Sequence, residues 1–189
     1  MKKHPEITGR ITLTGKAVGY VENPADPEGD DIEIQWPLLK TALDGDEVEI
    51  RLLPEVKNVR RQGEVVKIVK RAKMEFVGVL EKEPRGFFVV PDSKKMYRDI
   101  FIPPDKIKTP VGEQPEEGDK VFVHIAQWEG MDTNPQGEVL RVLGKKGVHN
   151  VEMESIVLEK GFDTRFPPEV ETEAKEVADG AHKHFAEEV

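Results

Sequence analysis

The side chains in this sequence that could do chemistry are aromatic rings and cations placed close together, the types that hold single-stranded nucleic acid. Rings stack on unpaired bases, while cations follow the phosphate backbone. In Arg85-Gly-Phe-Phe-Val-Val90 and Asp99-Ile-Phe-Ile102, strand alternation places Phe88 and Phe101 on one face. The alternative, that both rings belong to the core, stays open, because aromatic residues at strand spacing are more often buried than exposed.

Further rings and cations surround these two phenylalanines. The candidate stacking residues are Tyr20, Phe88, Tyr97 and Phe101, and the candidate phosphate contacts are Lys16, Arg60, Arg61, Arg85, Lys94, Lys95 and Arg98. Residues 57–73 hold seven cations against the single acid Glu64, which suits either a phosphate-binding patch or an ordinary solvated face. Glu33 is expected beside Tyr20, where a carboxylate repels phosphate.

The total charge argues against a polyanionic ligand, but its distribution weakens that argument. The chain has 189 residues and a formal net charge of −9. Residues 1–74 balance to zero and residues 75–147 to −2, whereas residues 148–189 carry −7. Because phosphate contact depends on a local patch, two nearly neutral segments with basic clusters remain compatible with nucleic-acid binding.

An internal repeat defines the elements that must position these side chains. Three motifs return in the same order after 68 to 74 residues, as Asp31-Ile-Glu-Ile34 and Asp99-Ile-Phe-Ile102, Gly45-Asp-Glu-Val-Glu-Ile50 and Gly118-Asp-Lys-Val-Phe-Val123, and Gln62-Gly-Glu-Val-Val-Lys-Ile-Val69 and Gln136-Gly-Glu-Val-Leu-Arg-Val-Leu143. Conserved order and spacing indicate two homologous domains. We expect them at 7–73 and 74–147, followed by a connector at 148–189.

Each repeat alternates apolar and polar residues at period two, which predicts strands. Five strands in about 70 residues predict an all-β fold of two tandem OB-type Greek-key barrels, with an SH3-like barrel as the competitor. A short helix is expected at Pro37-Leu-Leu-Lys-Thr-Ala-Leu43, where proline suits the first turn. The tail should be helical, because residues 169–188 are rich in Ala, Glu and Lys.

Several classes of function are disfavoured by composition. The sequence has no cysteine, no apolar run near the length of a membrane span and no signal peptide, so a cytoplasmic location without membrane contact is expected. No catalytic residues, metal ligands or glycine-rich phosphate loop are recognisable. We therefore expect no catalytic site, metal site or cofactor within this chain.

An ordered set of motifs resembles the N-terminal tandem cold-shock region of the ribonuclease II and ribonuclease R family. The second domain's set is Phe88-Val-Val-Pro-Asp92, Asp99-Ile-Phe-Ile-Pro-Pro104, Gly118-Asp-Lys-Val121, Pro135-Gln-Gly-Glu-Val139 and Val142-Leu-Gly144. Lys16-Ala-Val-Gly-Tyr-Val21, Ala42-Leu-Asp-Gly-Asp46 and Arg61-Gln-Gly-Glu-Val65 are similar to motifs of the first. The resemblance covers about residues 8–178.

The resemblance implies a module that guides single-stranded RNA into the catalytic domain of a 3′–5′ exoribonuclease. In that family an aspartate cluster in the catalytic domain holds magnesium, and we expect this domain to be absent from the chain. The chain is then a monomeric RNA-binding fragment whose partners are RNA and the absent domain. The alternative hypothesis is a protein-interaction module that uses the barrels and the acidic tail.

Overall fold

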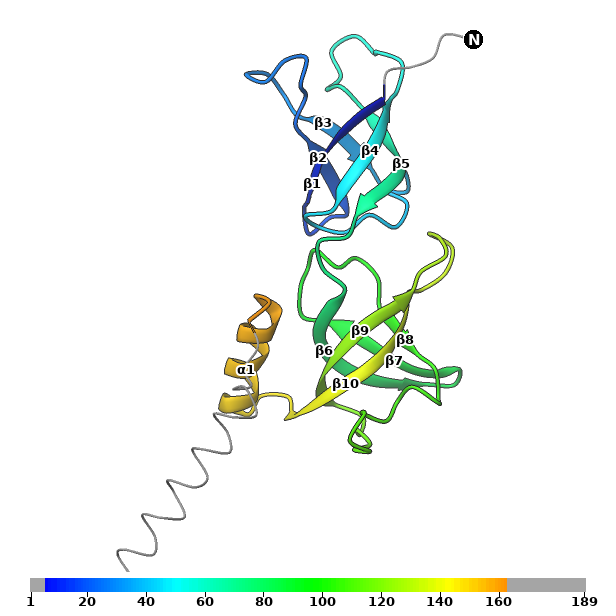
Figure 1. The fold of residues 1–189 in the computed structure, drawn as a ribbon, viewed down its shortest axis with the longest axis vertical. Helices are drawn as coiled ribbons and strands as arrows, with labels where there is room; N and C mark the ends of the chain where they lie inside the picture. Colours follow the sequence, from blue (N-terminus) through cyan, green and yellow to red (C-terminus); the bar gives the residue numbers. More distant parts are fainter. Residues whose placement is uncertain (1–5, 163–189) are drawn as a thin grey trace, which may run out of the picture.

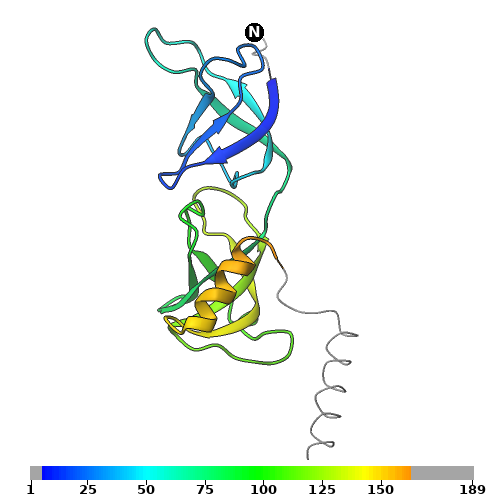
Figure 2. The same cartoon turned by 90° about the vertical axis from the view of Figure 1, so that its left-hand side faces the viewer.

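The computed structural model describes residues 6–162 and consists of two stacked β-barrels with one helix beside the second (Figures 1 and 2). The strands of the first barrel are β1 Glu6–Leu13, β2 Val18–Val21, β3 Ile32–Gln35, β4 Glu47–Leu52 and β5 Gly63–Lys70. Those of the second are β6 Glu75–Glu83, β7 Gly86–Pro91, β8 Ile100–Ile102, β9 Asp119–Gln127 and β10 Gln136–Lys145. Helix α1 spans His149–Glu159. The tail helix expected at 169–188 lies outside the described residues.

Both barrels use the same strand order, which confirms the OB-type expectation over the SH3-like alternative. The second is a closed barrel of order β10-β8-β7-β6-β9, in which Gln136 pairs in parallel with Phe101. The first sheet has the equivalent order β3-β2-β1-β4-β5. Its ends meet only through a parallel bridge between Glu33 and Gln62 and a hydrogen bond from the Glu33 amide to the Arg61 carbonyl, at 2.8 Å.

The alternating aliphatic residues form the two cores. The first core contains Ile11, Leu13, Val21, Ile32, Ile34, Leu39, Ala42, Val48, Ile50 and Val65. The second contains Phe76, Leu80, Val89, Met96, Ile100, Ile102, Ile107, Val121, Val123, Ile125 and Val139, and also Leu43 from the first barrel. A buried side chain of the first barrel therefore enters the core of the second, which the repeat could not reveal.

The short helix expected at residues 37–43 is wrong. This segment is a series of turns, closed by hydrogen bonds from the amides of Leu38, Lys40 and Ala42 to carbonyls three residues earlier. Lys40 has a φ of 53°, outside the helical region. The Leu38 carbonyl accepts a hydrogen bond from the Val65 amide of β5, so the segment is held by the sheet and not by helical bonds.

Helix α1 is fastened to the second barrel by a buried lysine. Lys120 on β9 donates to Asp92 and to Glu152 of α1, both at 2.6 Å. Burial lowers the pKa of Lys120, but the hydrogen bonds to the two carboxylates outweigh it and raise the pKa overall. The same Lys120 hydrogen bond, with one from the Gly147 amide, lowers the pKa of Glu152. The helix is thereby held against β9 at its first turn.

Candidate nucleic-acid interface

Phe88 and Phe101 form an aromatic pair on the outer face of the second barrel. They are directly opposite each other on β7 and β8, with ring centroids 5.3 Å apart and planes tilted by 50°. Both are half-buried, whereas Val89, Ile100 and Ile102 are fully buried. The alternation therefore places the two rings outside the barrel and the aliphatic residues inside, as expected from period two.

Gly86 leaves room for this pair at the start of β7. Its φ is 141°, and a Cβ atom added there would lie 2.8 Å from Cε2 of Phe101. A side chain at this position would therefore displace the ring. Arg85 stands exposed in the adjoining turn. Arg85 thus supplies a cation close to the strand end that carries the ring pair.

The corresponding face of the first barrel carries a carboxylate directly beside its ring. Tyr20 pairs across the strands with Glu33 and donates its hydroxyl to the Glu33 carboxylate at 3.4 Å. The Arg60 guanidinium lies 5.5 Å from the Tyr20 ring centroid and pairs with Asp30 at 2.8 Å. Glu33 lies beside Tyr20, as expected. Because its carboxylate repels phosphate, this face is less suited to nucleic acid than the Phe88–Phe101 face.

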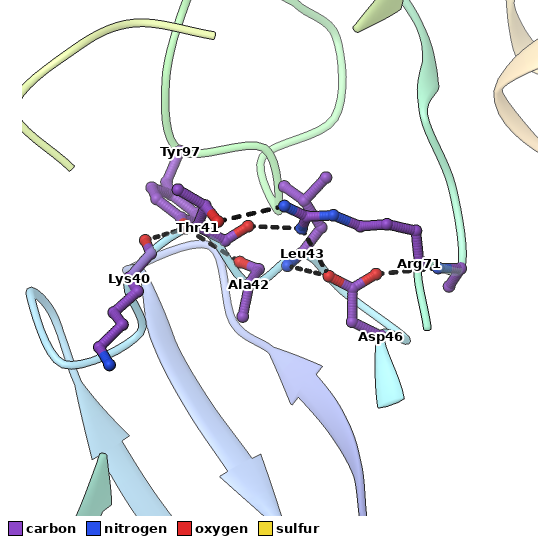
Figure 3. Close-up of polar contacts among 8 residues, drawn as sticks. Lys40, Thr41, Ala42, Leu43, Asp46, Arg71 and Tyr97 are labelled. Atoms are coloured by element: carbon purple, nitrogen blue, oxygen red, sulfur yellow. Dashed lines mark hydrogen bonds and ion pairs between the residues drawn. The ribbon is translucent and has the colours of Figure 1, made fainter. Parts of the chain in front are cut away.

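Tyr97 lies at the junction between the barrels. Its hydroxyl donates to the Ala42 carbonyl at 2.9 Å and lies 3.1 Å from the Lys40 carbonyl, both in the first barrel (Figure 3). Its ring packs on Trp128, with centroids 5.7 Å apart. Burial raises the pKa of the Tyr97 hydroxyl, so it stays a neutral donor. The geometry favours a structural role for Tyr97 over stacking on a base.

The remaining junction contacts come from the segment that carried one family motif, residues 42–46. Asp46 is fully buried, and its carboxylate accepts hydrogen bonds from the Leu43 and Ala72 amides and from Arg71, at 2.8 to 2.9 Å (Figure 3). Asp44 pairs with Lys95 of the second barrel at 2.8 Å. Lys95 therefore links the two barrels, Arg71 and Asp46 brace the first barrel's side of the junction, and Lys73 pairs with Glu159 at the end of α1.

A basic cleft opens beside this junction, between the β1–β2 turn and the loop that joins β7 to β8. It has a volume of about 680 Å³, and its charged lining residues are Lys16, Lys94, Arg98 and Asp99. Burial, with a smaller contribution from Glu83, raises the pKa of Asp99. The cleft brings together three of the cations selected from the sequence. Arg61 stands apart from it, with its Nη1 atom buried and without a hydrogen-bond partner among the described residues.

Sequence reasoning missed Trp36, which follows β3 and lies beside the cleft. Its side chain is 49% exposed, and the Arg98 guanidinium lies 5.8 Å from its ring centroid. The available signal was an indole in a turn just before a proline, in a chain with only two tryptophans. That signal does not predict the contact between Trp36 and Arg98, because the two residues are 62 positions apart in the sequence.

Within residues 6–162, no group of three or more His, Cys, Asp or Glu side chains is arranged to hold a metal ion. The described helix is too short and too polar to cross a membrane.

Comparison with known proteins confirms the resemblance seen in the motifs. Residues 88–167 match the family model of the cold shock domain. Ribonuclease R of Thermotoga maritima is 27% identical over 161 residues, which are 84% of this chain and 22% of the relative. Ribonuclease R of Escherichia coli is 30% identical over 133 residues, which are 70% of this chain and 16% of the relative. The chain thus spans only about a fifth of these relatives.

Solved structures show the same fold. Ribonuclease R of Mycoplasma genitalium, in complex with ribose-methylated single-stranded RNA, superposes with a TM-score of 0.75 and 22% identity. The superposed region is 90% of this chain and 26% of the Mycoplasma genitalium chain. Yeast Ssd1, described as a pseudonuclease, superposes with a TM-score of 0.68 and 18% identity, covering 83% of this chain and 25% of its own. The chain is therefore similar in sequence and fold to the cold-shock region of ribonuclease R.

Proposed function

We propose that this chain, a pair of cold-shock-type barrels homologous to part of ribonuclease R, binds single-stranded RNA and passes it to a ribonuclease domain. The observation that carries the proposal is the Phe88–Phe101 pair, two half-buried rings side by side on an outer barrel face. Base–aromatic stacking contributes about 1–3 kcal/mol per base and tolerates any sequence. The single-stranded RNA bound by the Mycoplasma genitalium relative supports the same class of ligand.

The charges near the rings supply the second part of the affinity. Arg85 stands at the end of the ring-bearing strands, and Lys16, Lys94 and Arg98 line the cleft. Neutralising phosphates with such cations releases bound counterions, so affinity should fall steeply as salt rises. Because neither stacking nor counterion release depends on base identity, binding should be tolerant of sequence.

The proposal is tested by fluorescence anisotropy with labelled oligouridylate of about 12 nucleotides, a length within the range that OB folds cover. Phe101→Ala should weaken binding roughly 5- to 140-fold, the effect of losing one stacked base. Phe162→Ala is the control, because it removes an equally large ring that is exposed (66%) but follows α1 and lines a different hollow. Equal affinities of both variants and wild type would contradict the stacking role, as would binding insensitive to salt.

Delivery to a ribonuclease domain is the further part of the proposal, and the outer face of α1 supports it. Met153 and Ile156 are more than half exposed and lie on one side of the helix, opposite the buried Val151 and Leu158. Clustered exposed apolar residues indicate a protein contact. They lie within residues 88–167, the region that matches the cold shock domain family model.

This partner can be tested in trans. A ribonuclease domain from a ribonuclease R relative should co-elute with the wild-type chain in size-exclusion chromatography, and the double variant Met153→Asp, Ile156→Asp should abolish co-elution while retaining RNA binding. Co-elution unaffected by the substitutions would rule out this face. The chain alone, incubated with RNA and magnesium, should leave the RNA intact, and shortened products would contradict a purely binding role.

A further inference from the structure

The exposed indole of Trp36 is the second aromatic surface that the structure offers to an unpaired base. Apart from Phe162, it is the only aromatic among the large apolar residues that are strongly exposed in residues 6–162. An indole left half in water is unusual, because such a large ring gains much from burial. Its position at the mouth of a charged cleft distinguishes it from a scattered surface residue.

The Arg98 guanidinium lies over this ring from the opposite barrel. The distance from Cζ of Arg98 to the Trp36 ring centroid is 5.8 Å, within cation–π range. Arg98 is itself fixed by donating to the Met131 carbonyl. An indole and a guanidinium are the two kinds of flat surface on which unpaired bases stack in RNA-binding proteins.

The space around the pair is open and mostly basic. Lys16, Ala17, Tyr97 and Arg98 line a hollow of about 420 Å³ together with Trp36. The same four residues also line the cleft of about 680 Å³, so the two hollows adjoin. The charged lining of the two hollows consists of three cations and Asp99. Phosphates of a strand could therefore be neutralised while its bases reach the ring.

The cleft and the Phe88–Phe101 face share the loop between β7 and β8. Arg98 lies three residues before Phe101 in the loop between β7 and β8, and this loop forms one wall of the cleft. A strand leaving the phenylalanine pair along this loop thus meets Lys94 and Arg98 before it reaches Trp36. The loop contacts Trp36 through Arg98 and leads to Phe101 on β8, so it links the two aromatic surfaces, which stand on different barrels.

We propose that Trp36 and Arg98 form a base-stacking site that single-stranded RNA reaches after the Phe88–Phe101 pair, so that one strand contacts both barrels. This inference rests on the proposed RNA-binding function and extends it to the first barrel, where the Glu33 carboxylate beside Tyr20 disfavours phosphate on the Tyr20 face. Paired bases bury their flat faces in the duplex, so the site selects unpaired nucleotides.

The experiment compares Trp36→Ala, Phe101→Ala and Phe162→Ala by anisotropy, with oligouridylates of about 5 and about 12 nucleotides. Trp36→Ala should weaken binding of the longer strand roughly 5- to 140-fold and change the shorter strand's affinity little, because only the longer strand reaches both surfaces. Trp36→Phe should restore most of the loss, since it keeps a ring. Unchanged melting curves of the variants confirm that folding is intact.

Two further readouts separate stacking from charge. A strand of the same length made of abasic sugars keeps the phosphates, so Trp36→Ala should not alter its affinity. RNA should quench the tryptophan fluorescence of the wild type, and the quenching should vanish in Trp36→Phe, which keeps Trp128. If Trp36→Ala weakens binding of the abasic strand equally, stacking at this ring is refuted.

The outcomes also distinguish this inference from the function on which it rests. If wild type binds RNA, Phe101→Ala weakens binding and Trp36→Ala does not, then the Trp36–Arg98 site is refuted and the proposed function stands. If wild type does not bind RNA at any salt concentration, both are refuted.

Discussion

Removing the Tyr97 hydroxyl should loosen the connection between the two barrels without disturbing either fold. This hydroxyl is held 2.9 Å from the Ala42 carbonyl, and the ring contacts both cores. In Tyr97→Phe the ring stays and the carbonyl loses its donor, which lowers the free energy of unfolding by about 0.5–1.5 kcal/mol. For a chain of this size the melting temperature should fall by about 2–4 °C per kcal/mol.

Tyr97→Ala removes the ring as well and has a larger expected effect. The ring's packing against both cores and its pairing with Trp128 are lost together. Truncating a packed aromatic residue costs about 3–5 kcal/mol, and the partial exposure of Tyr97 places the effect at the lower end. The contacts left across the junction would then be mainly Leu43, the exposed Lys95–Asp44 pair and the Arg98–Trp36 contact, so the barrels should unfold independently.

Differential scanning calorimetry of the whole chain measures both effects. The wild type should show one transition for the coupled barrels, Tyr97→Phe a single lower transition, and Tyr97→Ala two resolved transitions. Tyr20→Phe is the matched control, because Tyr20 is the chain's other tyrosine and its hydroxyl bond is long and lies on an outer face. If both Tyr97 variants melt like Tyr20→Phe, the contacts of Tyr97 do not couple the unfolding of the two barrels.

Three further changes test other parts of the structure. Leu43→Ala should lower the free energy of unfolding by about 2–5 kcal/mol and speed amide exchange in β9 and β10, because Leu43 lies in the core of the second barrel; faster exchange confined to β1–β5 would contradict this. Asp99→Asn should strengthen oligouridylate binding about two- to fivefold in anisotropy, because it removes the carboxylate that opposes phosphate in the cleft; an unchanged affinity would place the strand away from Asp99. Glu152 has a lowered pKa, so its contribution to stability is present above its ordinary value of 4.5 and is lost as pH falls through its lower folded value. The melting temperature of wild type should therefore drop more steeply than that of Glu152→Gln between about pH 5 and pH 3, and parallel curves would refute the Lys120–Glu152 contact.

The Phe88–Phe101 face was predictable because it depends on local geometry alone. Alternation along β7 and β8 decides which residues point inward. The antiparallel pairing of these two consecutive strands then places Phe88 opposite Phe101. The short helix at 37–43 was wrong for the complementary reason. Its proline and leucines suit a helix locally, but the Leu38 carbonyl bonds to β5, a contact 27 residues distant in sequence.

Period-two alternation and the internal repeat thus determined by themselves that the chain forms two similar barrels and which side of each strand is buried. Only the tertiary structure decided how the barrels meet, because the alternation relates a side chain to its own sheet and not to a second one. Tyr97 turned out to bond the first barrel, Lys95 to pair with Asp44, and Trp36 to lie under Arg98. The cleft that these contacts create has no counterpart in either repeat alone, so no pattern within one repeat could indicate it.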